Sequence, residues 1–136
     1  MIRRSLGAIV VVGLLSLASP ALAQTRDGIP VAIGPRGHVV EAHQAVVVKV
    51  KVLCPAGYDV LEAFVYVVQD GKQSNDGAIP VSCDGGPHKY AVRVPASQGQ
   101  AFHRGQAQAS AYVLVQDPNT GQTQDGQDTR DILIIR

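Results

Sequence analysis

Strict alternation of apolar and other residues in two stretches, 45–54 and 105–116, constrains the fold more than any other feature of this sequence. In the first stretch, alternate positions hold Val46, Val48, Val50, Val52 and Cys54, with Lys49 and Lys51 between them. In the second, Ala107, Ala109, Ala111, Val113 and Val115 alternate with Gln106, Gln108, Ser110 and Tyr112. Because successive side chains of a β-strand point to opposite faces, both stretches predict strands with one face in a core. No segment keeps a helical period of 3.6 residues, and there is no internal repeat.

Five further short strands are expected between clusters of turn-forming residues. They cover Ile29–Ile33, Val60–Gln69, Ala78–Cys83, His88–Val94 and Thr129–Ile135, and Val39–Val40 can continue the first beyond a kink at Gly37. The turn signals between strands are Gly34-Pro35, Pro55-Ala56-Gly57, Asp70-Gly71, Asp84-Gly85-Gly86-Pro87 and Asp117–Gly121. Seven strands in about 110 residues, with turns at regular intervals, predict an all-β fold, a single immunoglobulin-like β-sandwich.

The N-terminus has the three regions of a secretory signal peptide in order. Met1–Arg4 carries positive charge, Leu6–Leu17 is an uncharged apolar run of twelve residues, and Ala21-Leu22-Ala23 is an A-x-A cleavage pattern. A retained membrane anchor is the alternative, but a spanning helix needs about 20 apolar residues. We therefore expect a signal peptide at residues 1–23, a β-sandwich domain at 24–136, and secretion to the extracellular space or the periplasm.

Cys54 and Cys83 are the only cysteines, and both belong to the expected mature domain. In an exported domain of this size, two thiols are expected to form a disulfide. Closing a loop of about 30 residues contributes about 3.6 kcal/mol in the chain-entropy account, a large share of a typical domain's stability. A metal pair or a reactive thiol are the alternatives, although neither cysteine lies in a C-x-x-C motif.

Charge excludes some classes of partner. Removing residues 1–23 takes away Arg3 and Arg4, so ten of the twelve basic residues remain against eleven acidic ones, a net charge of −1. A near-neutral domain without a basic cluster predicts no nucleic-acid partner and no membrane association after signal cleavage.

An ordered set of short motifs resembles a known family. It consists of Cys54-Pro55-Ala56-Gly57, Gln69, Cys83-Asp84-Gly85, Val92-x-Val94 and Phe102-x-x-Gly105-x-Ala107-x-Ala109, spanning roughly residues 45–111. The set is similar to that of small secreted bacterial proteins, common in actinobacteria, grouped as a domain of unknown function. An aromatic of that pattern, often Trp, is Tyr90 here. The resemblance implies export, the disulfide and a sandwich, and it implies no activity.

Residues that could carry chemistry are dispersed. The candidates are the histidines His38, His43, His88 and His103 and the serines Ser74, Ser82, Ser97 and Ser110. No serine lies in a G-x-S-x-G or S-x-x-K setting, and the histidines lack zinc-ligand spacing. A calcium site at Asp117, Asp125 and Asp128 is an alternative, but their spacing matches no known calcium loop. We predict no catalytic residue, no metal and no cofactor.

One expected strand is apolar on both faces. In Val60–Gln69, Leu61, Ala63, Val65 and Val67 alternate with Val60, Phe64, Tyr66 and Val68, interrupted by Glu62. In a sandwich the third, sixth and seventh strands share a sheet, so Phe64 and Tyr66 are expected to meet Tyr112 and Leu114 on its outer face. Such a face predicts a dimer or partner surface; coverage by another segment or a strong sheet twist is the alternative.

The function expected from these features is a non-enzymatic binding or interaction module with an unknown protein partner or a second copy. The first alternative is a carrier of small molecules or ions such as calcium, with a pocket formed by loops 70–77, 95–104 and 117–127. A hydrolase is the least favoured reading.

Overall fold

The computed structural model describes residues 28–136, so the expected signal peptide at 1–23 lies outside the described residues. The described part of the chain forms eight strands and no helix, and it therefore contains no helix able to cross a membrane. The strands are β1 (Val31–Val40), β2 (Ala45–Leu53), β3 (Asp59–Gln69), β4 (Lys72–Gln73), β5 (Gly77–Ala78), β6 (Pro87–Pro95), β7 (Gly105–Gln116) and β8 (Thr123–Ile135). The all-β prediction is confirmed.

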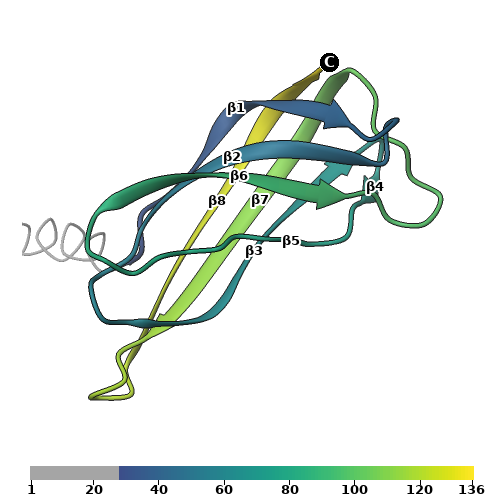
Figure 1. Ribbon diagram of the computed structural model, residues 1–136. Helices are drawn as coiled ribbons and strands as arrows, with labels where there is room; N and C mark the ends of the chain where they lie inside the picture. The colour runs from purple at the N-terminus through teal and green to yellow at the C-terminus, as the bar shows by residue number, and fades with distance from the viewer. Residues whose placement is uncertain (1–27) are drawn as a thin grey trace, which may run out of the picture.

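Hydrogen bonds join the strands into one curled sheet in the order β4-β3-β7-β8-β1-β2-β6, with β5 paired to β3. Its two halves face each other (Figure 1). We call β3, β7 and β8 the β7 layer, and β1, β2 and β6 the β2 layer. All pairs are antiparallel except β1 with β8, where residues 36–38 run parallel to residues 133–135. β1 is therefore the joint between the layers.

The core lies between the layers and is built from the alternate residues of the strands. Val46, Val48, Val50 and Val52 of β2 pack in one cluster with Val65, Val67, Ala109, Val113 and Val115 of the β7 layer. Each of these is at most 1 % exposed. The sequence alternation therefore predicted the inner faces of β2 and β7 correctly.

Residues 74–83 cross from the β7 layer to the β2 layer along the outer edge of β6. The amide of Asn75 donates to the carbonyl of Pro95 (3.0 Å), and the amide of Ser82 donates to the hydroxyl of Tyr90 (2.9 Å). A Cβ atom at Gly77 would lie 2.4 Å from the carbonyl oxygen of Arg93, so only glycine fits this approach. The crossing segment covers an edge that would otherwise expose unpaired backbone groups.

The prediction of a strand at Ala78–Cys83 is wrong beyond Ala78, because residues 79–83 lie outside any strand. Pro80 has no N–H group to donate to a ladder, and the segment bridges two layers instead of extending one. The predicted disulfide is confirmed: Cys54, just after β2, is bonded to Cys83 at the end of the crossing segment.

β1 kinks where it passes between the layers. Its pairing with β2 shifts register between Ile33 and Gly37, around the predicted Gly34-Pro35 break. At the kink, the amide of Ile33 donates to Asp128 Oδ2 (2.8 Å), and Arg130 Nη1 donates to the carbonyl of Ile33 (3.0 Å). Two charged side chains of β8 thus replace missing strand-to-strand hydrogen bonds.

β8 begins at Thr123, six residues before the strand start expected at Thr129. The stretch from Thr123 to Asp131 is polar and shows no apolar alternation, but it pairs with β7 along its whole length. Its strand conformation comes from the neighbouring strand rather than from its own residues.

Candidate interaction surface

The predicted surface residues meet on the outer side of the β7 layer. Phe64 of β3 is the direct cross-strand partner of Tyr112 of β7. Their ring centroids lie 5.8 Å apart, with ring planes inclined by 45°. This distance falls within the range at which aromatic pairs attract each other. Tyr66 lies opposite Ser110 and Leu114 opposite Glu62, so all four predicted residues occupy two adjacent strands. We call this surface the aromatic face.

A shallow hollow of about 270 Å³ lies beside the aromatic pair. Its lining comes from all three strands of the layer: Phe64, Tyr66, Ser110, Ala111, Tyr112, Gln127 and Thr129. On its floor the hydroxyls of Ser110 and Thr129 are hydrogen-bonded at 3.1 Å. The aromatic face therefore combines ring edges with hydroxyl and amide groups.

The aromatic side chains are half-buried rather than fully exposed. Phe64 pairs with Tyr112 on one side and with Ala78 of β5 on the other, so neighbouring strands flank it on both sides. The most exposed large apolar residues lie near strand ends: Val60 (38 %) and Leu61 (48 %) at the start of β3, and Leu133 (42 %) near the end of β8. The sequence pattern grouped Leu61 with core residues, but Leu61 is exposed and lies unpaired at the register shift between Val60 and Glu62.

Charge on the aromatic face is entirely acidic. By the strand register, the outward positions of β3, β7 and β8 hold Asp59, Glu62, Asp125 and Asp131 and no lysine or arginine. The hydroxyl of Tyr112 donates to Asp125 Oδ2 at 3.4 Å. Partial burial, followed by the negative charges of Asp125 and Glu62, raises the pKa of Tyr112 above its usual value.

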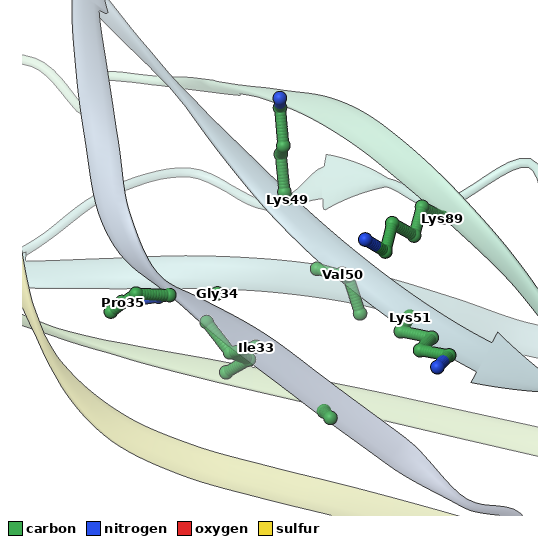
Figure 2. A pocket seen from close by; sticks show the side chains of 8 residues that line it. Ile33, Gly34, Pro35, Lys49, Val50, Lys51 and Lys89 are labelled. Carbon is green, nitrogen blue, oxygen red and sulfur yellow. The ribbon is translucent and has the colours of Figure 1, made fainter.

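The outer side of the β2 layer has the opposite charge. Lys49 and Lys51 of β2 and Lys89 of β6 line a hollow of about 400 Å³ next to the β1 kink (Figure 2). The sequence showed no basic cluster because Lys89 lies on a different strand from Lys49 and Lys51, and the pairing of β2 with β6 brings the three together. The signal that could have found them is the outward position of each lysine on its predicted strand; the pairing of β2 with β6 was not visible.

The histidines lie in separate places. Nε2 of His88 is 2.7 Å from Asp84 Oδ2, and Nε2 of His103 is 2.5 Å from Asp70 Oδ2. The hydrogen bonds that the His103 imidazole makes to the Asp70 carboxylate and to the Arg104 carbonyl raise the pKa of His103, whereas the Gly86 amide and His88 lower the pKa of Asp84. His43 Nδ1 lies 2.8 Å from the carbonyl of Phe102. His38, on the outer side of β1, lines a different hollow.

The serines show no nucleophile geometry. Ser74 accepts from the amide of Val67 and donates to the carbonyl of Asn75, Ser97 contacts Gln100, and Ser110 contacts Thr129. Within residues 28–136 none of these hydroxyls is hydrogen-bonded to a histidine. The hydroxyls of Ser74, Ser97 and Ser110 therefore have no histidine base hydrogen-bonded to them in the described residues.

The carboxylates considered for calcium diverge. Asp128 holds the β1 kink from the inner side of β8, Asp125 faces Tyr112, and Asp117 accepts from the amide of Asn119 in the β7–β8 turn. Among residues 28–136, no group of three or more His, Cys, Asp or Glu side chains could hold a metal ion.

The three loops of the carrier hypothesis do not converge on one pocket. Loops 70–77 and 95–104 lie together, since Lys72 Nζ donates to Gly99 and Gln100 Nε2 donates to the carbonyl of Lys72. Loop 117–127 begins at the other end of β7, a strand of twelve residues and so roughly 40 Å long.

No protein-family model, curated protein or solved structure matches this chain.

Proposed function

We propose that the protein is an exported, non-enzymatic binding module that recognises a protein partner through the aromatic face. The observation that carries the proposal is the Phe64–Tyr112 pair, half-exposed on the outer side of a layer whose inner side already fills the core. Aromatic side chains with a polar hollow beside them are typical anchor points of protein interfaces.

Export is supported by the disulfide. Bonds such as Cys54–Cys83 persist in oxidising, extracellular-type compartments and are rare where glutathione keeps thiols reduced. If the signal peptide at residues 1–23 is removed, mass spectrometry of the secreted protein should find Gln24 at its N-terminus. A secreted protein that begins at Met1 would contradict this part of the proposal.

The strand order supports an immunoglobulin-like architecture. β1, β2 and β6 form one layer and β3, β7 and β8 the other, which corresponds to the A-B-E and C-F-G groups of that fold. Two features differ from antibody domains: the disulfide does not join the two layers through β2 and β7, and the chain has no tryptophan. The resemblance is therefore one of architecture, in which binding commonly uses an outer sheet face or the end loops.

The charge of the aromatic face favours a partner other than a second copy. In a two-fold symmetric dimer the same patch meets itself, so the acidic face with Glu62 and Asp125 would meet an equally acidic face. Like charges across an interface are unfavourable, whereas a basic rim on a different protein would be attracted. We therefore propose a partner with an apolar centre and lysine or arginine residues around it.

The test compares pull-downs from culture supernatant with the wild-type protein and with the Phe64→Ser/Tyr66→Ser variant. The wild type should retain a specific partner that the variant loses, and light scattering should show the isolated protein to be monomeric. Val40→Ser/Val47→Ser is the matched control, because both valines are half-buried on the β2 layer. A wild-type monomer whose set of bound proteins is unchanged in the aromatic-face variant would refute the proposal.

A further inference from the structure

A continuous groove runs along the outer side of β1, on the layer opposite the aromatic face. It consists of three adjoining hollows of about 540, 400 and 440 Å³. The first and second share Gly34, Pro35 and Lys49, and the second and third share Ala32 and Lys51. We call the three together the lysine groove. It exists because residues 34–36 bulge away from β2 at the kink of β1.

The groove is lined by cations and by no carboxylate. Its basic residues are Arg36, Lys49, Lys51 and Lys89, and its other lining residues are apolar apart from His38. The three ion pairs of the described residues involve Arg93, His88 and His103 and none of these cations. Figure 2 shows the side chains of Lys49, Lys51 and Lys89 around the middle hollow.

The arrangement of the lysines is unfavourable in the free protein. Lys51 and Lys89 are direct cross-strand partners, and Lys49 is two residues along β2 from Lys51 on the same face. Like charges directly opposite each other destabilise a sheet pair, and diagonal neighbours about 7–8 Å apart add to the repulsion. An anionic ligand would remove this repulsion, so the cluster is better explained by binding than by folding.

We propose that the lysine groove binds an extended, phosphate-bearing polyanion without bases. The ligand is expected to be extended because the three hollows lie in a row, which one small anion would not fill. Phosphate is favoured because lysine ammonium groups bind phosphate as point charges and do not need the fixed two-bond geometry that arginine uses. A nucleic acid is disfavoured because the groove holds no Phe, Tyr or Trp on which a base could stack.

The first experiment measures thermal unfolding of the secreted protein, produced from the full chain, with long-chain inorganic polyphosphate. At a concentration about a hundred times Kd, the melting temperature should rise by about 10 °C by mass action. Orthophosphate at equal phosphate concentration should have a much smaller effect. Binding should weaken as the salt concentration rises. For three to four phosphate contacts, the logarithm of the association constant should fall against the logarithm of the salt concentration with a slope of about −2 to −3. No rise with polyphosphate would refute the proposal.

The second experiment uses the variant Lys51→Thr/Lys89→Thr. Without ligand at low salt it should melt at the same or a higher temperature than the wild type, because the repulsion is gone and threonine suits a strand. With polyphosphate it should lose most of the rise. Lys72→Thr, which removes an exposed lysine of β4, and Phe64→Ser/Tyr66→Ser should both keep the rise. The result of this experiment therefore does not depend on whether the aromatic face binds a protein partner.

Three results would overturn the inference. One is a double lysine variant that keeps the full rise. Another is a double lysine variant that melts below the wild type without ligand, since the lysines would then serve the fold. The third is an equal or larger rise with polygalacturonate or with oligothymidylate, which carry carboxylates and bases respectively.

Discussion

The two outer faces of this sandwich differ although the strands beneath them follow the same rule. Both layers point alternate residues inward to one shared core. On the β7 layer, the outward positions carry an aromatic pair and four carboxylates; on the β2 layer, they carry Lys49, Lys51 and Lys89. The comparison shows that alternation determines which side of a strand is free for function and leaves the chemistry of that side open.

The layers also differ in how their turns are built. The β7–β8 turn places a glycine, Gly121, at a positive φ of 77°. The β1–β2 turn instead holds Glu41, Ala42 and His43 at φ of 52°, 53° and 73°. Three successive left-handed residues with side chains are costly, and contacts with neighbouring segments hold them. Glu41 pairs with Arg93 at 2.5 Å, which lowers the pKa of the Glu41 carboxyl, and the Phe102 amide donates to the carbonyl of His43.

The largest expected effect tests how much the disulfide stabilises the domain that carries the two faces. The Cys54–Cys83 bond closes 29 residues of sequence separation and fastens the crossing segment to β2. Cys54→Ser/Cys83→Ser should lower the free energy of unfolding by about 3.6 kcal/mol and the melting temperature by about 15 °C or more. Reduction of the wild type should have the same effect in the same thermal scan. Undiminished stability in either case would mean that the attachment of the crossing segment to β2 contributes nothing to the stability of the domain.

The next effect concerns the joint between the layers. Asp128→Ala removes the acceptor for the Ile33 amide at the β1 kink, and hydrogen bonds to charged groups contribute about 1.5–3 kcal/mol. We expect a loss in that range, measured by urea unfolding. Asp131→Ala, on the outer side of the same strand, should change stability by less than about 0.5 kcal/mol. Equal losses in the two variants would contradict the assignment of Asp128 to the joint.

A smaller effect should distinguish the β1–β2 turn from the β7–β8 turn. Ala42→Gly should raise stability by about 0.5–1 kcal/mol, because glycine adopts positive φ without the steric cost of a side chain. Gly121→Ala should lower stability by about 1 kcal/mol for the reverse reason. A Cβ atom at Gly121 would have no neighbour within 4 Å, so the change there is purely one of the backbone. The same sign of change in both variants would show that φ is not the cause.

The smallest effect is a pH dependence at one end of the β7 layer. The pKa of His103 is raised above 6.5 because its imidazole donates hydrogen bonds to the Asp70 carboxylate and to the Arg104 carbonyl. The contribution of protonated His103 to the free energy of unfolding is therefore complete below pH 6.5, and it is lost as the pH rises through the folded-state pKa. NMR titration should find a raised imidazole pKa that falls in Asp70→Asn. An unchanged pKa in that variant would exclude Asp70 as the main cause.

Much of the candidate aromatic face was predictable from the sequence. Phe64, Tyr66, Tyr112 and Leu114 were expected on one outer sheet face, and they lie on adjacent strands there. Their degree of exposure was not predictable, because it depends on β5 beside Phe64 and on the ring-to-ring contact with Tyr112. Leu61 was expected in the core but is exposed, since the bulge between Val60 and Glu62 interrupts the pairing with β7 and no residue type announces it.

The outward positions of the lysines were predictable from the sequence, but their meeting in the lysine groove was not. Lys89 lies 38 positions after Lys51 in the chain, and nothing local in the sequence states that β6 pairs with β2. The kink of β1 was visible as Gly34-Pro35, but its parallel pairing with β8 and the hollows beside it depend on the far end of the chain.

The sequence alone determined the strands with their own apolar alternation, the inner faces of β2 and β7, most turn positions and the disulfide. These features depend on neighbouring residues, because side-chain direction in a strand has a period of two and turns need particular residues. Only the tertiary structure decided the strand order, the joint at β1, the early start of β8 and the opposite charges of the outer faces. Those features arise from contacts between residues far apart in the chain, which no local pattern specifies.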